Sequence, residues 1–411
     1  MRILFVGLNF YPEPISTGVY SGELADYLRS KGHPLRVVTA PPYYPWWQVQ
    51  APYAAWRYQR ETWQGLEIWR CPLWVPRRAS GVRRLIHLAS FALASAPVLV
   101  WQAQWHPDVV LSVAPTLLSA PFVLLSSRFG KAKTWLHIQD FELEAGLQLN
   151  ILHAQGGLAK MADHLERRVL QGFDHLSTIS RRMEQHLWQK GIPPSRTSLF
   201  PNWVDAKRIY PMARAAVSLR AQLGFNPEEV VVLYSGNMGK KQGLECLLEA
   251  AQLLAGERSL RFVLCGEGMM RRQLQEQARG LAQVRFIPLQ PPENLNALLN
   301  LADLHVLPQR AEAADLVMPS KLSGMLASGR AVIGMAERQT ELGEVLEAAG
   351  VRVPAGDSAA LAGAIQALAH DGQRREELGR IGRTYALQHW EKEKVLQGFE
   401  EELRQWVAGL L

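Results

Sequence analysis

Cysteine is scarce in this chain, and its three cysteines, Cys71, Cys246 and Cys265, lie far apart. No two of them form a Cys-x-x-Cys pair, so the sequence indicates neither a disulfide framework nor a zinc site. A protein that keeps its thiols unpaired fits a reducing compartment, which predicts a cytoplasmic location.

Long apolar runs are also missing. Residues 85–101 (LIHLASFALASAPVLVW) carry no acid or strong base, but this run contains Pro97 and is shorter than the roughly 20 residues of a spanning helix. We expect a helix that either lies on a membrane surface or packs in the core. The first apolar run, residues 1–7, meets Asn9 and Pro12 too soon for a signal peptide and predicts a buried strand.

Acidic residues are sparse between residues 57 and 84, where seven arginines stand against Glu61 and Glu67. The whole chain is basic, with a net charge of +7 and a pI of about 9.4. Such a run attracts either nucleic acid phosphates or a lipid surface, and its place beside the apolar stretch favours an anionic membrane. The alternative is a core helix with a solvated basic flank. The candidate membrane residues are Arg77, Arg78, Arg83 and Arg84, and the tryptophans that suit an interface are Trp46, Trp47, Trp56 and Trp63.

What the chain does contain is a long alternation of strand-length apolar runs with helical patterns. Its 411 residues exceed one ordinary core, and 48% hydrophobic with 20% charged residues is a globular composition. Near-continuous apolar strands between helices are typical of parallel sheets covered on both faces. The predicted strands are residues 3–9, 35–40, 109–114, 134–138, 176–179 and 198–200, then 230–235, 261–264, 284–287, 304–307, 331–333 and 351–353.

Two such series predict an α/β protein with two Rossmann-like, doubly wound domains that face each other across a cleft. The first domain spans residues 1–205 and the second spans residues 206–390. A C-terminal helix at residues 391–411 could pack back on the first domain.

The dinucleotide fingerprint is absent. The first strand ends in Gly7-Leu8-Asn9-Phe10, without the G-x-G-x-x-G that lets a pyrophosphate approach a helix. Gly266 and Gly268 supply a G-x-G only after the second strand of the second domain. This pattern argues against a dehydrogenase.

Two turns in the second domain bring cations to the ends of strands. Residues 235–243 (SGNMGKKQG) place Lys240 and Lys241 in a glycine-rich turn, and residues 319–321 (PSK) place Lys321 at a helix start. Backbone amides next to an ammonium bind phosphate well, so we expect a diphosphate here. The alternatives are an ordinary βα turn with solvated lysines and a simple helix cap.

These motifs, in this order, resemble the retaining nucleotide-sugar glycosyltransferases of the GT-B fold. Residues 201–205 (PNWVD) are similar to the P-N-G-V-D of that family, and residues 177–181 to its S-x-x-S. Residues 236–243 match its phosphate-binding segment, and residues 322–329 its L-x-E-A-M-A-x-G helix. The wording N-F-Y-P-E, G-N-M-G-x-x-Q-G-L and M-P-S-K-L is closest to a subgroup in exopolysaccharide assembly of the colanic-acid type.

The resemblance implies that a sugar moves, with retention, from a nucleotide-sugar, such as GDP-fucose or another GDP-sugar, to a polyprenyl-diphosphate-linked saccharide. It also implies that the first domain binds the acceptor and the second domain binds the nucleotide-sugar. It implies a peripheral position on the inner face of the plasma membrane, with no nucleic acid partner. No D-x-D motif occurs at the predicted site, and lysines offset the diphosphate charge, so neither a metal nor a cofactor is implied. The implied catalytic residues are His137 beside the donor sugar, Asp140 in the acceptor cleft, Lys241 and Lys321. The implied donor-binding residues are Gly18, Gly236, Asn237, Lys240, Lys241, Gly266, Asp315, Pro319, Ser320, Lys321 and Leu322.

The sequence departs from the family at its glutamate pair. The E-x7-E positions fall on Leu316 and Gly324, neither of which is acidic, although Asp315 could substitute for the first. Asn237 stands where the family has an arginine. These departures keep open a non-catalytic subunit that binds nucleotide-sugar or glycolipid and, more weakly, a sugar-nucleotide epimerase.

Asp140 also has a structural alternative, as the cap of a helix whose first turn carries Glu142 and Glu144.

Overall fold

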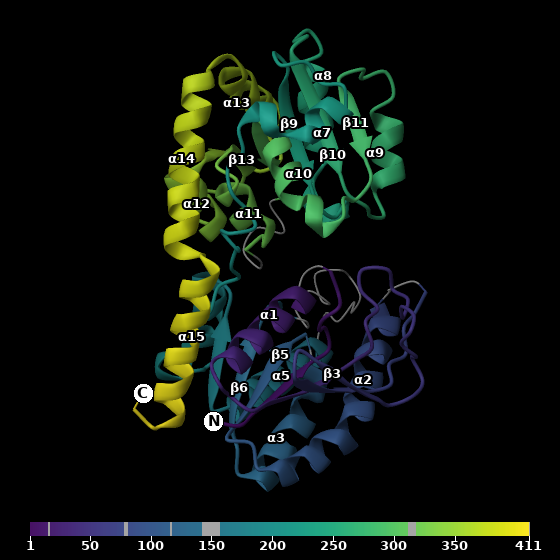
Figure 1. Ribbon diagram of the computed structural model, residues 1–411, viewed down its shortest axis with the longest axis vertical. Helices are drawn as coiled ribbons and strands as arrows, with labels where there is room; N and C mark the ends of the chain where they lie inside the picture. The colour runs from purple at the N-terminus through teal and green to yellow at the C-terminus, as the bar shows by residue number, and fades with distance from the viewer. Residues whose placement is uncertain (15–16, 78–80, 116, 142–156, 311–317, 411) are drawn as a thin grey trace. The chain divides into compact units, whose positions relative to one another are not determined.

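The chain folds into two compact units. A computed structural model describes residues 1–14, 17–77, 81–115, 117–141, 157–310 and 318–410. Unit 1 consists of Met1–Pro201 together with Leu396–Leu411, and unit 2 consists of Asn202–Val395 (Figure 1). Unit 1 is therefore built from two separate stretches of sequence.

Unit 1 is built on an eight-stranded sheet with the strand order β3-β4-β2-β1-β5-β6-β7-β8. Its strands are β1 (Ile3–Gly7), β2 (Leu35–Thr39), β3 (Gln59–Trp63), β4 (Leu66–Arg70), β5 (Val109–Ala114), β6 (Lys133–Ile138), β7 (His175–Thr178) and β8 (Thr197–Leu199). The strands pair in parallel except for β3 with β4, which pair antiparallel. The central strands are buried on both faces, as their uninterrupted apolar sequences predict.

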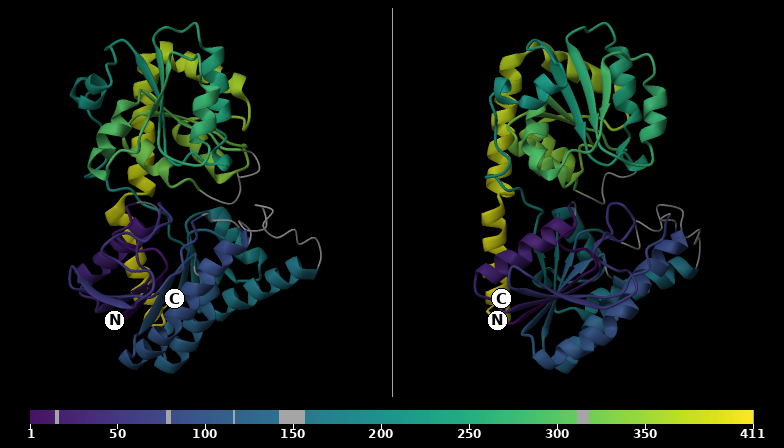
Figure 2. Two further views of the ribbon diagram at one scale, coloured as in Figure 1. Left: turned by 90° about the vertical axis from the view of Figure 1, so that its right-hand side faces the viewer. Right: turned by 45° about the vertical axis from the view of Figure 1, so that its right-hand side comes forward.

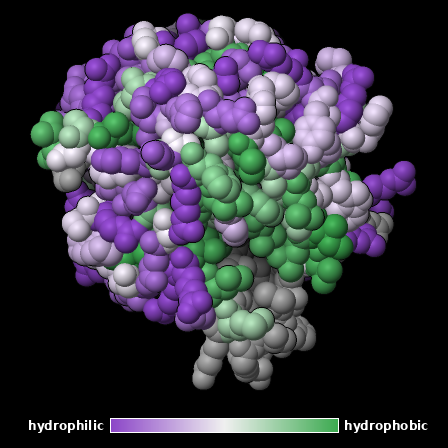
Figure 3. Space-filling model, turned by 90° about the horizontal axis from the view of Figure 1, so that it is seen from below, coloured by the Kyte–Doolittle hydropathy of each residue, from purple (hydrophilic) through white to green (hydrophobic). Residues whose placement is uncertain are grey.

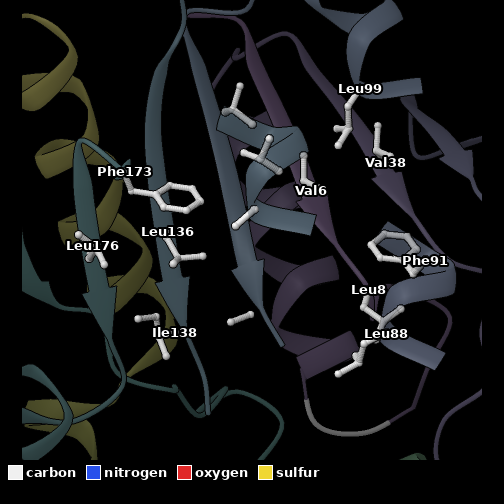
Figure 4. Packing of buried hydrophobic residues seen from close by; sticks show 14 of the residues in the cluster. Val6, Leu8, Val38, Leu88, Phe91, Leu99, Leu136, Ile138, Phe173 and Leu176 are labelled. Carbon is white, nitrogen blue, oxygen red and sulfur yellow. The ribbon is translucent and has the colours of Figure 1, made fainter. Parts of the chain in front are cut away.

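Helices cover both faces of this sheet. Its helices are α1 (Thr17–Ser30), α2 (Gly81–Gln102), α3 (Ala120–Gly130), α5 (Gly157–Gly172), α6 (Arg181–Gln189) and α15 (Lys392–Val407). On one face, α2, α3, α5 and α6 form a single apolar cluster with the sheet, in which Phe91 lies beside Leu8 and Phe173 beside Leu136 (Figure 4). On the other face, the C-terminal helix α15 packs against Trp135 of β6. The core of unit 1 therefore includes residues from the end of the sequence.

Unit 2 has a six-stranded parallel sheet with the strand order β11-β10-β9-β12-β13-β14. Its strands are β9 (Val230–Ser235), β10 (Leu260–Cys265), β11 (Val284–Ile287), β12 (Leu304–Leu307), β13 (Ala331–Met335) and β14 (Val351–Val353). Its helices are α7 (Ser218–Gln222), α8 (Glu245–Leu253), α9 (Arg271–Gln277), α10 (Leu295–Leu301), α11 (Lys321–Ala327), α12 (Glu341–Ala349), α13 (Ser358–His370) and α14 (Gly372–His389). All six strands expected in this half of the sequence are present.

The β3–β4 hairpin is an element that the sequence prediction missed. Its two-residue turn has positive φ at both Gln64 (47°) and Gly65 (80°), the geometry that suits a tight antiparallel hairpin. The hairpin corrects the prediction of one basic run, because it removes two of the seven arginines from it. Arg70 is 1% exposed and bonded to Glu61, and Arg60 pairs with Glu67 at 3.2 Å.

Candidate functional site

Residues predicted to bind the donor meet at one point of the unit 2 sheet. In a doubly wound sheet, ligands bind beyond the carboxyl ends of the strands, where the strand order reverses. In unit 2 this place lies between β9 and β12. Gly236 follows β9 directly, and Lys321 begins α11, the helix that follows β12. A Cβ on Gly236 would lie 3.2 Å from Lys321 Nζ, so the ammonium stands directly over the turn.

The Lys321 ammonium is held by a tyrosine. Nζ donates a hydrogen bond to the Tyr234 hydroxyl at 3.0 Å and lies 4.1 Å from the centre of the Tyr234 ring. The Tyr234 hydroxyl donates in turn to Asn237 O at 2.6 Å. Burial lowers the pKa of the Lys321 ammonium to about 7. A bound anion would stabilise the charged form, so this lysine is suited to a phosphate.

The glycine turns after β9 and β10 pack backbone against backbone. Gly236 N donates to Cys265 O at 2.9 Å. A Cβ on Gly266 would lie 1.9 Å from Gly236 O, and a Cβ on Gly268 would lie 2.5 Å from Met238 O. Their φ angles of +148° and +153° are also glycine conformations. The packing of the two turns therefore accounts for the G-x-G of this sequence.

The remaining predicted donor residues differ in exposure. Asn237 and Lys240 are exposed, with Lys240 on a 3₁₀ turn (Lys240–Gln242) ahead of α8 rather than on the helix itself. The side chain of Lys241 and the whole of Asp315 lie outside the described residues.

The residues around Lys321 also differ from one another. Pro319 is partly buried and Ser320 is exposed, and the Ser320 hydroxyl makes no capping hydrogen bond to α11. The alternative of a simple serine cap at α11 therefore does not hold. The Leu322 side chain is fully buried in an apolar cluster, so only the backbone of that residue can contact a ligand.

His137 lies inside unit 1 rather than on a surface. It is on β6 with 2% exposure, and both ring nitrogens have partners: Nδ1 bonds to Ser177 Oγ at 3.0 Å, and Gln139 Nε2 donates to Nε2 at 2.8 Å. The ring packs against Phe200. Burial lowers the pKa of His137 to about 3, so the imidazole is neutral at physiological pH. Both ring nitrogens therefore already have partners within unit 1, and the position of His137 beside a donor sugar stays a prediction.

Asp140 follows β6 and is partly buried, at the edge of the sheet where ligands bind. The alternative role of Asp140, as the cap of a helix whose first turn carries Glu142 and Glu144, concerns residues outside the described ones. Within the described part of the chain, no three His, Cys, Asp or Glu side chains are grouped to hold a metal ion.

Glu13 is a buried carboxylate next to the predicted donor residue Gly18, and sequence reasoning did not single it out. It is 3% exposed after β1, and its Oε1 accepts hydrogen bonds from Tyr43 N at 3.1 Å and Tyr44 N at 3.0 Å. A Cβ on Gly18 would lie 2.9 Å from Glu13 Oε2, so the glycine near the start of α1 makes room for this carboxylate. The available signal was the motif N-F-Y-P-E, in which Glu13 is the last residue.

Comparison with known proteins identifies the family. Residues 17–203 match the Glycosyl transferase 4-like domain, and residues 229–371 match Glycosyl transferases group 1. The chain is 42% identical over 413 residues to an Escherichia coli (strain K12) protein named as the colanic acid biosynthesis glycosyl transferase WcaI. The alignment covers 98% of this chain and 100% of the relative. The chain belongs to the WcaI-like glycosyltransferases.

Solved structures show the fold of this glycosyltransferase. Sucrose-phosphate synthase from Thermosynechococcus elongatus superimposes with a TM-score of 0.78 at 19% identity, over 100% of both chains. HepE of Anabaena, in complex with UDP and glucose, has a TM-score of 0.70 at 18% identity, over 98% of this chain and 100% of that one. The two parallel-sheet units form a GT-B fold, as the sequence predicted.

The predicted membrane residues of the glycosyltransferase lie at and before the start of α2. This helix has 22 residues, so it is longer than the apolar run 85–101 that predicted it. Among the described residues, Gly81–Trp105 is long and apolar enough to cross a membrane by length and composition alone, a property that core helices share. Arg77 and Arg83 are exposed and Arg84 is partly buried, whereas Arg78 lies outside the described residues.

Proposed function

We propose that this glycosyltransferase moves a sugar from a GDP-linked donor, such as GDP-fucose, to a polyprenyl-diphosphate-linked saccharide with retention of configuration. Its similarity to WcaI, which is named for colanic acid biosynthesis, supports a role in polysaccharide assembly. HepE, which has the same fold, was solved with UDP and glucose, and this supports a nucleotide-sugar as the donor.

The observation that carries the proposal is the position of Lys321. Its ammonium lies over the Gly236 turn, at the point where the strand order of the sheet reverses. A cation held there by Tyr234 is placed to bind a diphosphate group. The exposed Lys240 on the neighbouring turn adds positive charge to the same end of the sheet.

In the proposed reaction, the bond between the sugar and the diphosphate breaks, and the diphosphate oxygen keeps the bonding electrons. Lys321, together with Lys240 and Lys241, stabilises this departing negative charge. The acceptor hydroxyl then attacks the oxocarbenium-like sugar from the face that the diphosphate leaves, and its proton passes to a phosphate oxygen. This route uses no histidine base, which is consistent with the neutral, buried His137.

We further propose that lysine charge replaces a divalent metal ion in this reaction. Chelation is the direct test, because transfer that survives excess EDTA and does not increase with Mg²⁺ or Mn²⁺ supports the proposal. Loss of transfer on chelation, with recovery on adding either ion, would contradict it.

A peripheral position on the inner face of the plasma membrane is also a proposal. It is supported by an exposed apolar surface on unit 1, where α2 and α3 lie side by side and apolar side chains gather (Figures 2 and 3). The exposed apolar residues on or next to these helices are Val82, Ile86, Leu93, Val100, Trp101, Leu118, Leu125 and Phe129. Basic residues beside an apolar helix face are typical of docking on anionic lipid.

The activity is tested by incubating the purified chain with a panel of GDP-, UDP- and dTDP-sugars and a polyprenyl-diphosphate-linked saccharide. Transfer from a GDP-sugar, with the anomeric configuration of the product matching the donor, is the expected result. Transfer with inversion, or no transfer from any donor, contradicts the proposal.

One observation favours a second candidate, a non-catalytic subunit that binds nucleotide-sugar. Gly324, where the family has the second glutamate of its pair, gives α11 no carboxylate at that position. In the same panel, a subunit of this kind would show a thermal shift with one nucleotide-sugar and no product.

A further inference from the structure

Unit 1 contains an open groove lined by four indole rings. It has a volume of about 890 Å³ and lies between the segments that follow β2 and β4 and one side of α2, which contributes Ser90 and Ala94. The rings that line it are Trp46, Trp47, Trp56 and Trp74. We refer to it as the indole groove.

The walls of the indole groove are fixed by hydrogen bonds to α2. Trp74 N donates to Ser90 Oγ at 3.0 Å, and His87 Nδ1 donates to Trp74 O at 2.7 Å. Trp47 has a φ of 51°, which bulky residues rarely adopt, and its ring packs against His87 and Tyr43. These contacts hold Trp47 and Trp74 in place on the groove wall.

The chemistry of the lining favours a hydrocarbon over a sugar. None of the described residues that line the groove is acidic, and Arg77 is the charged one among them. The polar lining residues are Gln48 and Ser90, and the Ser90 hydroxyl is already used, because it donates to His87 O at 2.7 Å. Apart from the indole N–H groups, few hydrogen-bonding groups are therefore left for sugar hydroxyls, whereas the indole and aliphatic walls together suit an apolar chain.

The position of the groove connects it to the exposed apolar surface of α2. Ala94 lines the groove, and its neighbour Leu93 is 67% exposed on α2. At the groove itself, the Trp56 side chain is 79% exposed. The groove therefore shares α2 with the exposed apolar surface that is proposed to face the bilayer.

The charge of this region complements an anionic head group. Arg77, Arg83 and Arg84 lie at or before the start of α2, the helix that contributes Ser90 and Ala94 to the groove. Arg77, which is exposed, places one of these cations on the groove itself.

We propose that the indole groove binds the first isoprene units of a polyprenyl diphosphate, with Arg77 as the cation for the diphosphate. This inference rests on the proposed function, because it assigns the lipid part of the proposed acceptor to particular residues. In this arrangement the protein, and not the bilayer, surrounds the isoprene units next to the diphosphate. The saccharide end of the acceptor then lies outside the bilayer.

Farnesyl diphosphate is the probe for the test, with the full chain carrying Lys321→Ala so that diphosphate binding in unit 2 is weakened. Titration should quench tryptophan fluorescence and give a dissociation constant, and inorganic diphosphate should not reproduce the quenching. Trp56→Ala combined with Trp74→Ala should weaken farnesyl diphosphate binding at least tenfold. The control is Trp188→Ala, another partly exposed tryptophan of unit 1 that does not line the groove, and it should leave the affinity unchanged.

Two results would overturn the proposal: equal affinity for farnesyl diphosphate in the double variant, or equal quenching by inorganic diphosphate. This binding assay is independent of transfer. If farnesyl diphosphate binds and no donor reacts, the proposed function fails while the groove assignment stands. If transfer occurs and the double variant binds the probe normally, the groove assignment alone fails.

Discussion

The Lys321 ammonium, with a pKa of about 7, should make donor binding depend on pH. Below pH 7 the free protein already carries the charge, so affinity should be constant there. Above pH 7 Lys321 is mostly neutral in the free protein. It must take up a proton when the donor binds, because the bound diphosphate stabilises the charged ammonium and raises its pKa. We therefore expect the dissociation constant of the nucleotide-sugar to increase about tenfold per pH unit above pH 7. Calorimetry in buffers of different ionisation enthalpy should detect the proton that is taken up on binding.

The variant Lys321→Ala should abolish this pH dependence and lower kcat/KM about 10- to 100-fold, which corresponds to one charge-assisted contact of roughly 1.5 to 3 kcal/mol. Lys207→Ala removes a lysine of unit 2 that is 80% exposed and serves as the control. Unchanged kinetics in Lys321→Ala, with the protein folded, would remove Lys321 from the site.

Sequence reasoning predicted the place of Lys321 but not its environment. A lysine that follows a strand in a doubly wound sheet must lie near the ligand-binding edge, so position follows from pattern alone. The contact with Tyr234 depends on the side-chain packing of two strands, which the sequence does not specify. His137 shows the same limit, since its burial depends on Phe200, which stacks on Phe399 from a distant part of the chain.

At the scale of single elements, α2 is the segment whose role is most open to test. Changing Arg77, Arg78, Arg83 and Arg84 together to glutamine should largely release the protein from anionic vesicles at low salt. Each basic residue near such a surface contributes about 1 kcal/mol, and the contribution falls as salt screens it. Vesicle co-sedimentation measures the effect, and activity on a water-soluble acceptor analogue should persist.

A matched variant keeps the change in net charge the same. Arg272, Arg279, Arg338 and Arg380 are exposed on unit 2, and changing these four to glutamine should leave vesicle binding intact. If the wild-type protein ignores anionic vesicles, or if both variants bind alike, α2 is a core helix with a solvated flank.

The elements that the sequence predicted best are the buried parallel strands, because apolar runs of strand length repeat at regular intervals. The β3–β4 hairpin was missed because its residues include four charges, which suggested a basic surface run rather than a strand pair. Those charges pair across the hairpin, as Arg60 with Glu67 and Arg70 with Glu61. Cross-strand pairing of this kind is not visible in a count of net charge.

At the scale of the whole molecule, unit 1 depends on α15. Trp406 is 8% exposed and lies 5.3 Å from Trp135, ring centre to ring centre, and Lys133 Nζ donates to Trp406 O at 2.8 Å. We expect Trp406→Ala to lower the free energy of unfolding of unit 1 by about 3 kcal/mol, because a large buried ring is lost. Hydrogen exchange should increase in β6 and β7 and stay unchanged in β9 and β12.

The control for this change is Leu410→Ala, which alters a residue just beyond α15 that is 76% exposed. It should leave exchange in both units as it is in the wild type. Equal loss of protection in the two units after Trp406→Ala would mean that they unfold together, and no loss would mean that α15 contributes little to unit 1.

The division of unit 1 between two stretches of sequence also affects how the protein is made. On the ribosome, residues 1–201 emerge first, but the helix that covers Trp135 follows only after residues 202–395. At roughly 5 to 20 residues per second, that delay lasts on the order of ten seconds or more. During this interval the part of the first sheet around Trp135 lacks its covering helix in the nascent chain, so chaperones that bind apolar surfaces have time to act before unit 1 is complete.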